Sequence, residues 1–150
     1  MVHVQRTFTV DRPVDLVVDY LKDFANAEAW DPGTERCERA GSVADPVVVG
    51  TKWHNVSKVR GKETELSYRL DRLERARLTF VGTNKTATST DDITFHEAGA
   101  GTRITYDSNI VFHGLAKLAD PLMRREFERL GDETVEQMTG VLNGLPEGSE

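Results

Sequence analysis

The chain has 150 residues, 38% of them apolar, and its 19 basic and 25 acidic residues give a net charge of −6. A domain of this length buries roughly 70% of the surface of its unfolded chain, so a core and a cavity need no disulfide, and only one cysteine is present. No apolar run approaches the roughly 18 residues of a membrane helix, and the acidic balance disfavours general binding to nucleic-acid phosphates. We therefore expect one cytoplasmic domain over residues 1–144, without integral membrane association, and a flexible tail over residues 145–150.

The first thirty residues predict one strand and two short helices. A β-rich run extends from Val2 to Val10. Apolar residues then recur at helical spacing and predict a helix over about residues 13–22. A second, very short helix should end at Trp30, because the following Asp31-Pro32-Gly33 sequence is a turn signal.

Between Thr34 and His113 the period changes, and short β-type runs alternate with turn signals rich in Gly, Asp and Asn. Connections this short join antiparallel neighbours. The prediction is a six-stranded meander that the first strand joins at an edge. Its strands should cover about residues 34–40, 51–59, 63–73, 77–82, 86–96 and 102–113.

Alternation along these strands separates an apolar inner face from a charged outer face. The large apolar residues assigned to the inner face include Trp53, Leu66, Phe80, Phe95 and Phe112. The same parity places several polar side chains on that face, namely Asn55, Ser57, Tyr68, Ser89, Asp91, Tyr106 and Ser108.

A long helical pattern over about residues 114–143 should cover this apolar face. Its apolar stripe is expected to comprise Leu115, Leu118, Leu122, Phe127, Leu130 and Met138. Gly131 and Gly140 interrupt the pattern, and each costs about 1 kcal/mol relative to Ala inside a helix.

This order of elements resembles the helix-grip fold of the START and Bet v 1-like (SRPBCC) superfamily. The segments from Arg6 to Pro13, from Val17 to Asn26 and from Trp30 to Thr34 resemble the opening of its bacterial polyketide cyclase/dehydrase-like members. The fold class implied is α+β, with a seven-stranded antiparallel sheet curved around a long C-terminal helix and two short helices after the first strand.

The resemblance also implies a deep pocket between the sheet and the long helix, which the family uses for polyketides, lipids, sterols or plant hormones. Some relatives catalyse aldol cyclisation or dehydration, and many only bind. Because relatives place their acids and bases differently, no catalytic motif is carried over residue by residue.

The candidate catalytic residues are Asp91 and Tyr106, with Tyr68 as an alternative to the latter. A cyclase or dehydrase needs a group that removes a proton beside a carbonyl and another that stabilises the enolate oxygen. A register error of one residue would exchange Asp91 with Asp92, so an exposed acid at a strand end is the simpler interpretation of this position. Both tyrosines also suit a structural role as amphipathic core residues.

Several polar groups among large apolar side chains suit a pocket that orients a mostly apolar ligand. Trp30 is expected to close one end of the core or the pocket mouth. The predicted ligand-binding residues are Trp30, Trp53, Asn55, Ser57, Tyr68, Phe80, Ser89, Phe95, Ser108, Phe112 and Leu122.

Neither a metal site nor a cofactor is predicted. The four histidines fall at strand ends or on the expected outer face, and none has the i, i+4 partner of a zinc-binding helix. Cys37 has no CxxC partner, and no phosphate loop or dinucleotide fingerprint occurs.

The leading hypothesis is a protein that binds a small hydrophobic or amphipathic ligand, polyketide-like or lipid-like, between sheet and helix. One alternative is a polyketide cyclase or dehydratase that uses acid-base residues in the same cavity. Another is a protein-protein interaction module that uses the helix or an edge strand. A monomer and a homodimer are both compatible with the sequence.

Overall fold

The computed structural model describes residues 1–147, and at positions 119 and 120 it describes the backbone alone. Seven strands lie within the described range: β1 (Val2–Val10), β2 (Thr34–Ala40), β3 (Lys52–Val59), β4 (Lys62–Glu74), β5 (Arg77–Thr83), β6 (Ala87–Ala98) and β7 (Gly101–Phe112). The helical elements are α1 (Val14–Leu21), the 3₁₀ helix η1 (Phe24–Asn26), α2 (Ala27–Trp30), the 3₁₀ helix η2 (Gly114–Ala119) and α3 (Asp120–Asn143).

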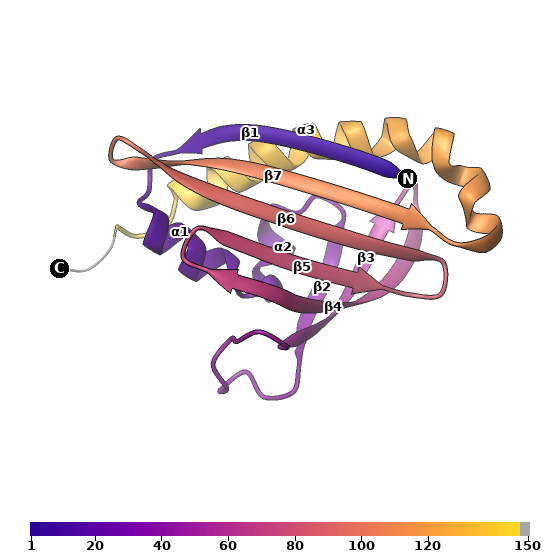
Figure 1. The fold of residues 1–150 in the computed structure, drawn as a ribbon, viewed down its shortest axis with the longest axis horizontal. Coiled ribbons are helices and arrows are strands. Elements are labelled where there is room, and N and C mark those ends of the chain that lie inside the picture. The colour runs from indigo at the N-terminus through magenta and orange to yellow at the C-terminus, as the bar shows by residue number, and fades with distance from the viewer. Residues whose placement is uncertain (148–150) are drawn as a thin grey trace.

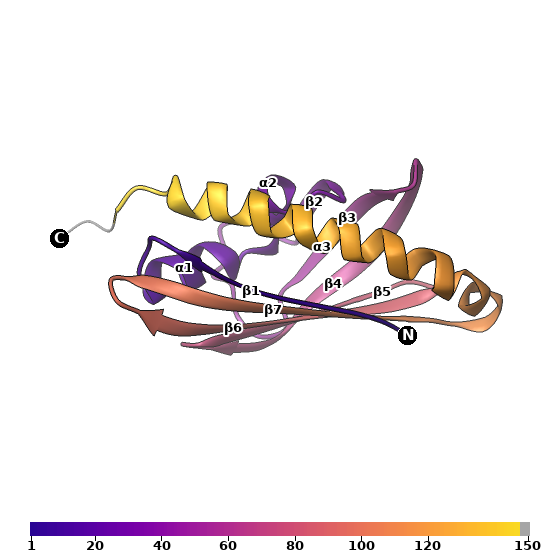
Figure 2. The same cartoon turned by 90° about the horizontal axis from the view of Figure 1, so that it is seen from above.

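The strands form one antiparallel sheet in the order β1-β7-β6-β5-β4-β3-β2. Six strands follow one another as a meander, and β1 pairs with β7 at the open edge, as the sequence predicted (Figure 1). Register shifts between Thr34 and Arg36 and between Leu70 and Arg72 mark irregularities of the kind that bend strands. The sheet curves around α3, so the fold is the predicted helix-grip fold (Figure 2).

The two early helices close one end of the curved sheet. Asp23 begins η1, where its carboxylate accepts a hydrogen bond from the backbone N–H of Ala25 at 3.1 Å. Phe24 then packs edge-on against Trp30, with ring centroids 5.9 Å apart, and both side chains are buried. The main hydrophobic core therefore lies between these helices and the inner face of the sheet.

Helix α3 lies along β1 and α2 rather than across the middle of the sheet (Figure 2). Gly131 allows this close approach, because a Cβ at that position would lie 2.7 Å from Cγ1 of Val4. At its C-terminal end the helix is held by Asn143, whose side-chain oxygen accepts a hydrogen bond from the backbone N–H of Asp11 at 2.7 Å.

The prediction that Leu115, Leu118 and Leu122 pack on the sheet is wrong. Their exposed fractions are 87%, 81% and 55%. The first two lie in η2, whose 3₁₀ geometry breaks the phase of the helical stripe, and Leu122 lies one residue before the face of α3 that approaches the sheet. That face instead begins at Met123.

The remaining predicted packing is mostly confirmed. Met138 of α3 is buried, as are Ile93, Phe95, Ile104 and Ile110 of the sheet, whereas Leu130 of α3 and Phe112 of β7 are only partly buried.

The predicted tail begins with an anchored residue. The carbonyl of Leu145 accepts a hydrogen bond from Nε of Arg12 at 2.8 Å, and its side chain packs against the main core. Residues 148–150, which complete the predicted tail, lie outside the described residues.

Candidate functional site

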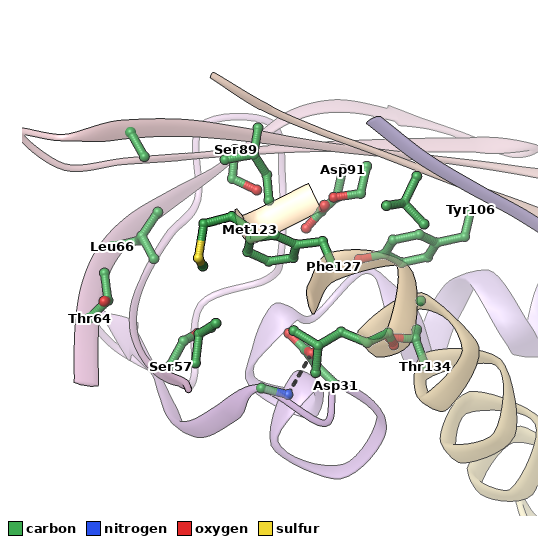
Figure 3. Close-up of a pocket in the computed structure, with 18 of the residues that line it drawn as sticks. Asp31, Ser57, Thr64, Leu66, Ser89, Asp91, Tyr106, Met123, Phe127 and Thr134 are labelled. Carbon is green, nitrogen blue, oxygen red and sulfur yellow. Dashed lines mark hydrogen bonds between the residues drawn. The ribbon is translucent and has the colours of Figure 1, made fainter. Parts of the chain in front are cut away.

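A cavity of about 210 Å³ lies between the inner face of the sheet and α3 (Figure 3). Its lining includes Val4 and Ile110 from a small hydrophobic cluster, and Tyr68 and Tyr106, which belong to or pack against the main core. Members of both clusters therefore contribute to the cavity wall. Helix α3 contributes Met123, Phe127, Leu130, Gly131, Thr134 and Val135 to the lining of the cavity.

Asp91 is the buried carboxyl group on the sheet side of this cavity. It lies on β6 directly opposite Ser108 of β7, and only 5% of its surface is exposed. Burial, together with the negative charge of Asp31, raises the pKa of Asp91 to about 7, although the hydroxyl groups of Ser108 and Tyr106 hydrogen-bond to it and favour the charged form. Asp91 therefore loses its proton at a much higher pH than an exposed aspartate does.

Asp31 supplies a second carboxyl group from the opposite wall, directly after α2. Its Oδ1 accepts a hydrogen bond from the backbone N–H of Gly33 at 3.0 Å, and its Oδ2 accepts one from the hydroxyl of Thr34 at 2.8 Å. Burial raises its pKa despite these two donors. Figure 3 shows Asp31 and Asp91 projecting from opposite walls toward the cavity.

Two tyrosines add hydroxyl groups to the lining of the cavity. Burial and the charge of Asp91 raise the pKa of both Tyr68 and Tyr106 well above the ordinary value, so both remain neutral hydroxyl groups. The ring of Tyr68 lies directly over Gly82 of β5, where a Cβ would come within 2.5 Å of its Cζ. Glycine at this position therefore gives the ring the space it occupies.

Arg6 of β1 also lines the cavity, but its guanidinium is bound to α3. Its Nε donates to Asp132 at 2.9 Å and an Nη donates to Glu128 at 2.8 Å, and further bonds reach the carbonyls of Gln5 and Glu128. Among the described lining residues, no other lysine, arginine or histidine is present.

The model of one protein family, described as polyketide cyclase / dehydrase and lipid transport, matches residues 1–142. The chain belongs to this family. No curated protein matches it.

Solved structures show that this polyketide cyclase/dehydrase and lipid transport family member shares its fold with START-superfamily proteins. A START superfamily protein from Mycobacterium smegmatis superimposes with a TM-score of 0.78 at 11% identity, covering 96% of this chain and 99% of that chain. The Zhui aromatase/cyclase from Streptomyces sp. R1128 superimposes with a TM-score of 0.76 at 18% identity, covering 93% and 92%. The di-domain ARO/CYC BexL from the BE-7585A biosynthetic pathway superimposes with a TM-score of 0.68 at 14% identity, covering 97% of this chain and 52% of that chain.

In this family member, seven of the residues singled out from the sequence line the cavity: Ser57, Tyr68, Ser89, Asp91, Tyr106, Ser108 and Phe112. Five others do not line it and are buried elsewhere: Trp30, Trp53, Asn55, Phe80 and Phe95. Leu122, predicted to bind ligand from the helix, is exposed and outside the lining, so that prediction is corrected.

Trp53 and Asn55, which are buried outside the lining, have hydrogen-bond partners, whereas the buried indole N–H of Trp30 has none among the described residues. The indole N–H of Trp53 donates to Asp23 at 2.9 Å, and the amide of Asn55 donates to the hydroxyl of Thr34 at 3.2 Å while accepting from Ser57 at 2.6 Å. Their inward direction was predicted correctly, but Trp53 connects β3 to the start of η1, and Asn55 connects β3 to the start of β2.

Asp31 is the important lining residue that sequence reasoning missed. The Asp31-Pro32-Gly33 sequence predicts only the end of a helix, and α2 does end at Trp30. One feature of the sequence could have indicated it: Asp31 is a carboxylate within the Trp30–Thr34 segment, which resembles the N-terminal part of the polyketide cyclase/dehydrase-like proteins. Its place in the cavity depends on the path of the chain from α2 into β2.

Within the described residues, no group of three or more His, Cys, Asp or Glu side chains is arranged to hold a metal ion. None of the described helices is long and apolar enough to cross a membrane.

Proposed function

We propose that this protein binds a small, mostly apolar ligand in the cavity between the sheet and α3. The observation that carries the proposal is a cavity of about 210 Å³ whose lining combines apolar side chains with a few polar groups. Such a combination is typical of sites that hold an apolar body and orient it through a few polar groups.

The volume indicates the size of the ligand. An apolar cavity of about 150 Å³ accepts benzene, so a cavity of about 210 Å³ suits a compact body larger than one aromatic ring. Met123 and Phe127 of α3 line this space together with Leu66 and Ile110 of the sheet. A polyketide-like or lipid-like molecule would place its apolar part there and its oxygen atoms toward Asp91 and Tyr106.

Titration with 1-naphthalenemethanol, a neutral bicyclic probe, tests the proposal. Ser108→Phe should abolish binding, because the new ring fills the cavity from the middle of β7. The matched control is Val111→Phe, which adds a ring on the exposed face of the same strand. Binding that survives Ser108→Phe in a folded protein would contradict the proposal.

A second candidate function is cyclisation or dehydration of a polyketide-like substrate in the same cavity. The observation in its favour is the pairing of Asp91 with Tyr106. A carboxyl group with a pKa of about 7 can act as general base near neutral pH, and a neutral tyrosine hydroxyl can donate to a developing enolate oxygen. The similarity to an aromatase/cyclase at 18% identity supports the fold of such an enzyme and leaves its chemistry to be tested.

A further inference from the structure

The polar groups of the cavity differ in charge from those of a site for fatty acids or other carboxylates. Asp31 and Asp91 face the cavity from opposite walls. The two carboxyl groups are close enough that the charge of Asp31 acts on Asp91. The remaining polar lining consists mainly of hydroxyl groups, including Tyr68, Tyr106 and Ser89. An anionic ligand would therefore enter a space that already contains two acids.

The cation that could compensate an anionic ligand is already bound elsewhere. Arg6 donates to Glu128 and Asp132 of α3, and so two carboxylates neutralise its charge before any ligand arrives. A ligand carboxylate would have to compete with both of them. By contrast, hydroxyl or amine donors of a ligand would find carboxylate oxygens without displacing an existing ion pair.

We infer that the cavity selects ligands that carry hydrogen-bond donors and no negative charge, with Asp31 and Asp91 as the acceptors. This inference rests on the proposed ligand-binding function and specifies the chemical class of the ligand. A phenol, an alcohol or an amine on a compact apolar body fits it, whereas free fatty acids and aromatic carboxylates do not.

Three probes with the same ring system test this selection: 1-naphthalenemethanol, 1-naphthylmethylamine and 1-naphthoate. At pH 7.5 the alcohol and the amine should bind at least about tenfold more tightly than the carboxylate, because burying a like charge beside two acids is unfavourable. Equal or tighter binding of naphthoate would overturn the inference while leaving the proposed function intact. If none of the three binds to the folded protein, the proposed function itself fails, and the inference fails with it.

Replacing one acid identifies the source of the discrimination. Asp91→Asn should bring the affinity for naphthoate closer to that for the alcohol, because it removes a charge of the same sign from the cavity. Asp92→Asn is the matched control, since the neighbouring residue points to the outer face and pairs with Arg77 and Thr79. Unchanged discrimination in Asp91→Asn, or an equal change in Asp92→Asn, would count against the inference.

A pH series on the unmodified protein gives a second measurement that needs no variant. The groups that face or influence Asp91 are Asp31, Tyr106 and Ser108, with Asp107 acting from the outer face of β7. Because both cavity tyrosines remain neutral, the negative charge of the cavity increases with pH through deprotonation of its two acids, Asp31 and Asp91, whose pKa values are both raised. The preference for the alcohol over naphthoate should therefore increase between pH 5.5 and 8.5, and a preference that is flat or decreases over that range would refute the assignment.

Discussion

Gly131 of α3 lies directly above Val4 of β1, so close that a single added methyl group would come within 2.7 Å of Cγ1 of Val4. Arg6 lies beside the same position, with its Cζ 3.5 Å from the place of that methyl group. The helix can therefore rest on β1 only because position 131 has no side chain.

Gly131→Ala should destabilise the protein despite the higher helix propensity of alanine, because α3 must move away from β1 or Val4 must shift. Gly140→Ala is the matched control in the same helix. A Cβ there meets nothing within 4 Å, so this change should stabilise the fold by about 0.4–1 kcal/mol. Urea denaturation of both variants measures the difference, and two equally stabilised variants would show that the contact with Val4 is easily relieved.

Trp30→Ala should lower the free energy of unfolding by about 3–5 kcal/mol, because it leaves a cavity where a fully buried ring packs against Phe24 and Tyr106. Since Tyr106 lines the ligand cavity, affinity for 1-naphthalenemethanol should also fall. Leu115→Ala, at a side chain 87% exposed, should change stability by less than about 0.5 kcal/mol. Thermal melting measures the stability of each variant, and titration measures its affinity for 1-naphthalenemethanol. A Trp30→Ala protein as stable as wild type would disprove the packing argument.

The raised pKa of Asp91 predicts a specific dependence of stability on pH. The unfolded chain loses this proton near the ordinary pKa of 3.8, whereas the folded protein keeps it until about pH 7. Between these values the unfolded state binds fewer protons, so the contribution of Asp91 to the free energy of unfolding falls as pH rises, by about 4 kcal/mol in all. Above pH 7 it changes no further.

Asp91→Asn should remove this dependence and gain stability relative to wild type as pH rises from 4 to 8. Denaturation curves at several pH values measure the difference between the two proteins. Asp92→Asn should behave oppositely, because hydrogen bonding to Arg77 lowers the pKa of Asp92 and its contribution is lost only as pH falls. A constant difference between wild type and Asp91→Asn would show that Asp91 ionises normally in the folded protein.

If the cavity is catalytic, Asp91→Asn and Tyr106→Phe should each reduce turnover of a polyketone or β-hydroxyketone model substrate by roughly 100-fold or more. Affinity for a neutral ligand should stay within about 1 kcal/mol, the scale of one hydrogen bond. Steady-state turnover and direct titration separate the two effects. Wild-type protein that binds these ketones without converting them would instead favour a carrier.

The sequence by itself determined the sheet and its faces. Alternation of apolar and polar residues has a period of two in a strand, so parity predicted that Asp91 faces inward and Asp92 outward, as the structure has them. A register error of one residue would have exchanged the two, and the simpler interpretation of Asp91 as an exposed acid at a strand end is wrong, because Asp91 lies within β6 and is only 5% exposed. The same rule placed Tyr68, Ser89 and Ser108 on the side that lines the cavity.

The tertiary structure alone decided three matters that no periodic pattern contains. It placed Asp31 in the cavity, because only the path of the chain from α2 into β2 brings that turn opposite Asp91. It left Leu115 exposed, because a 3₁₀ helix breaks the phase of the helical stripe before α3 begins. It also gave Gly131 its role, because a glycine that weakens an isolated helix is required where that helix touches a strand distant in sequence.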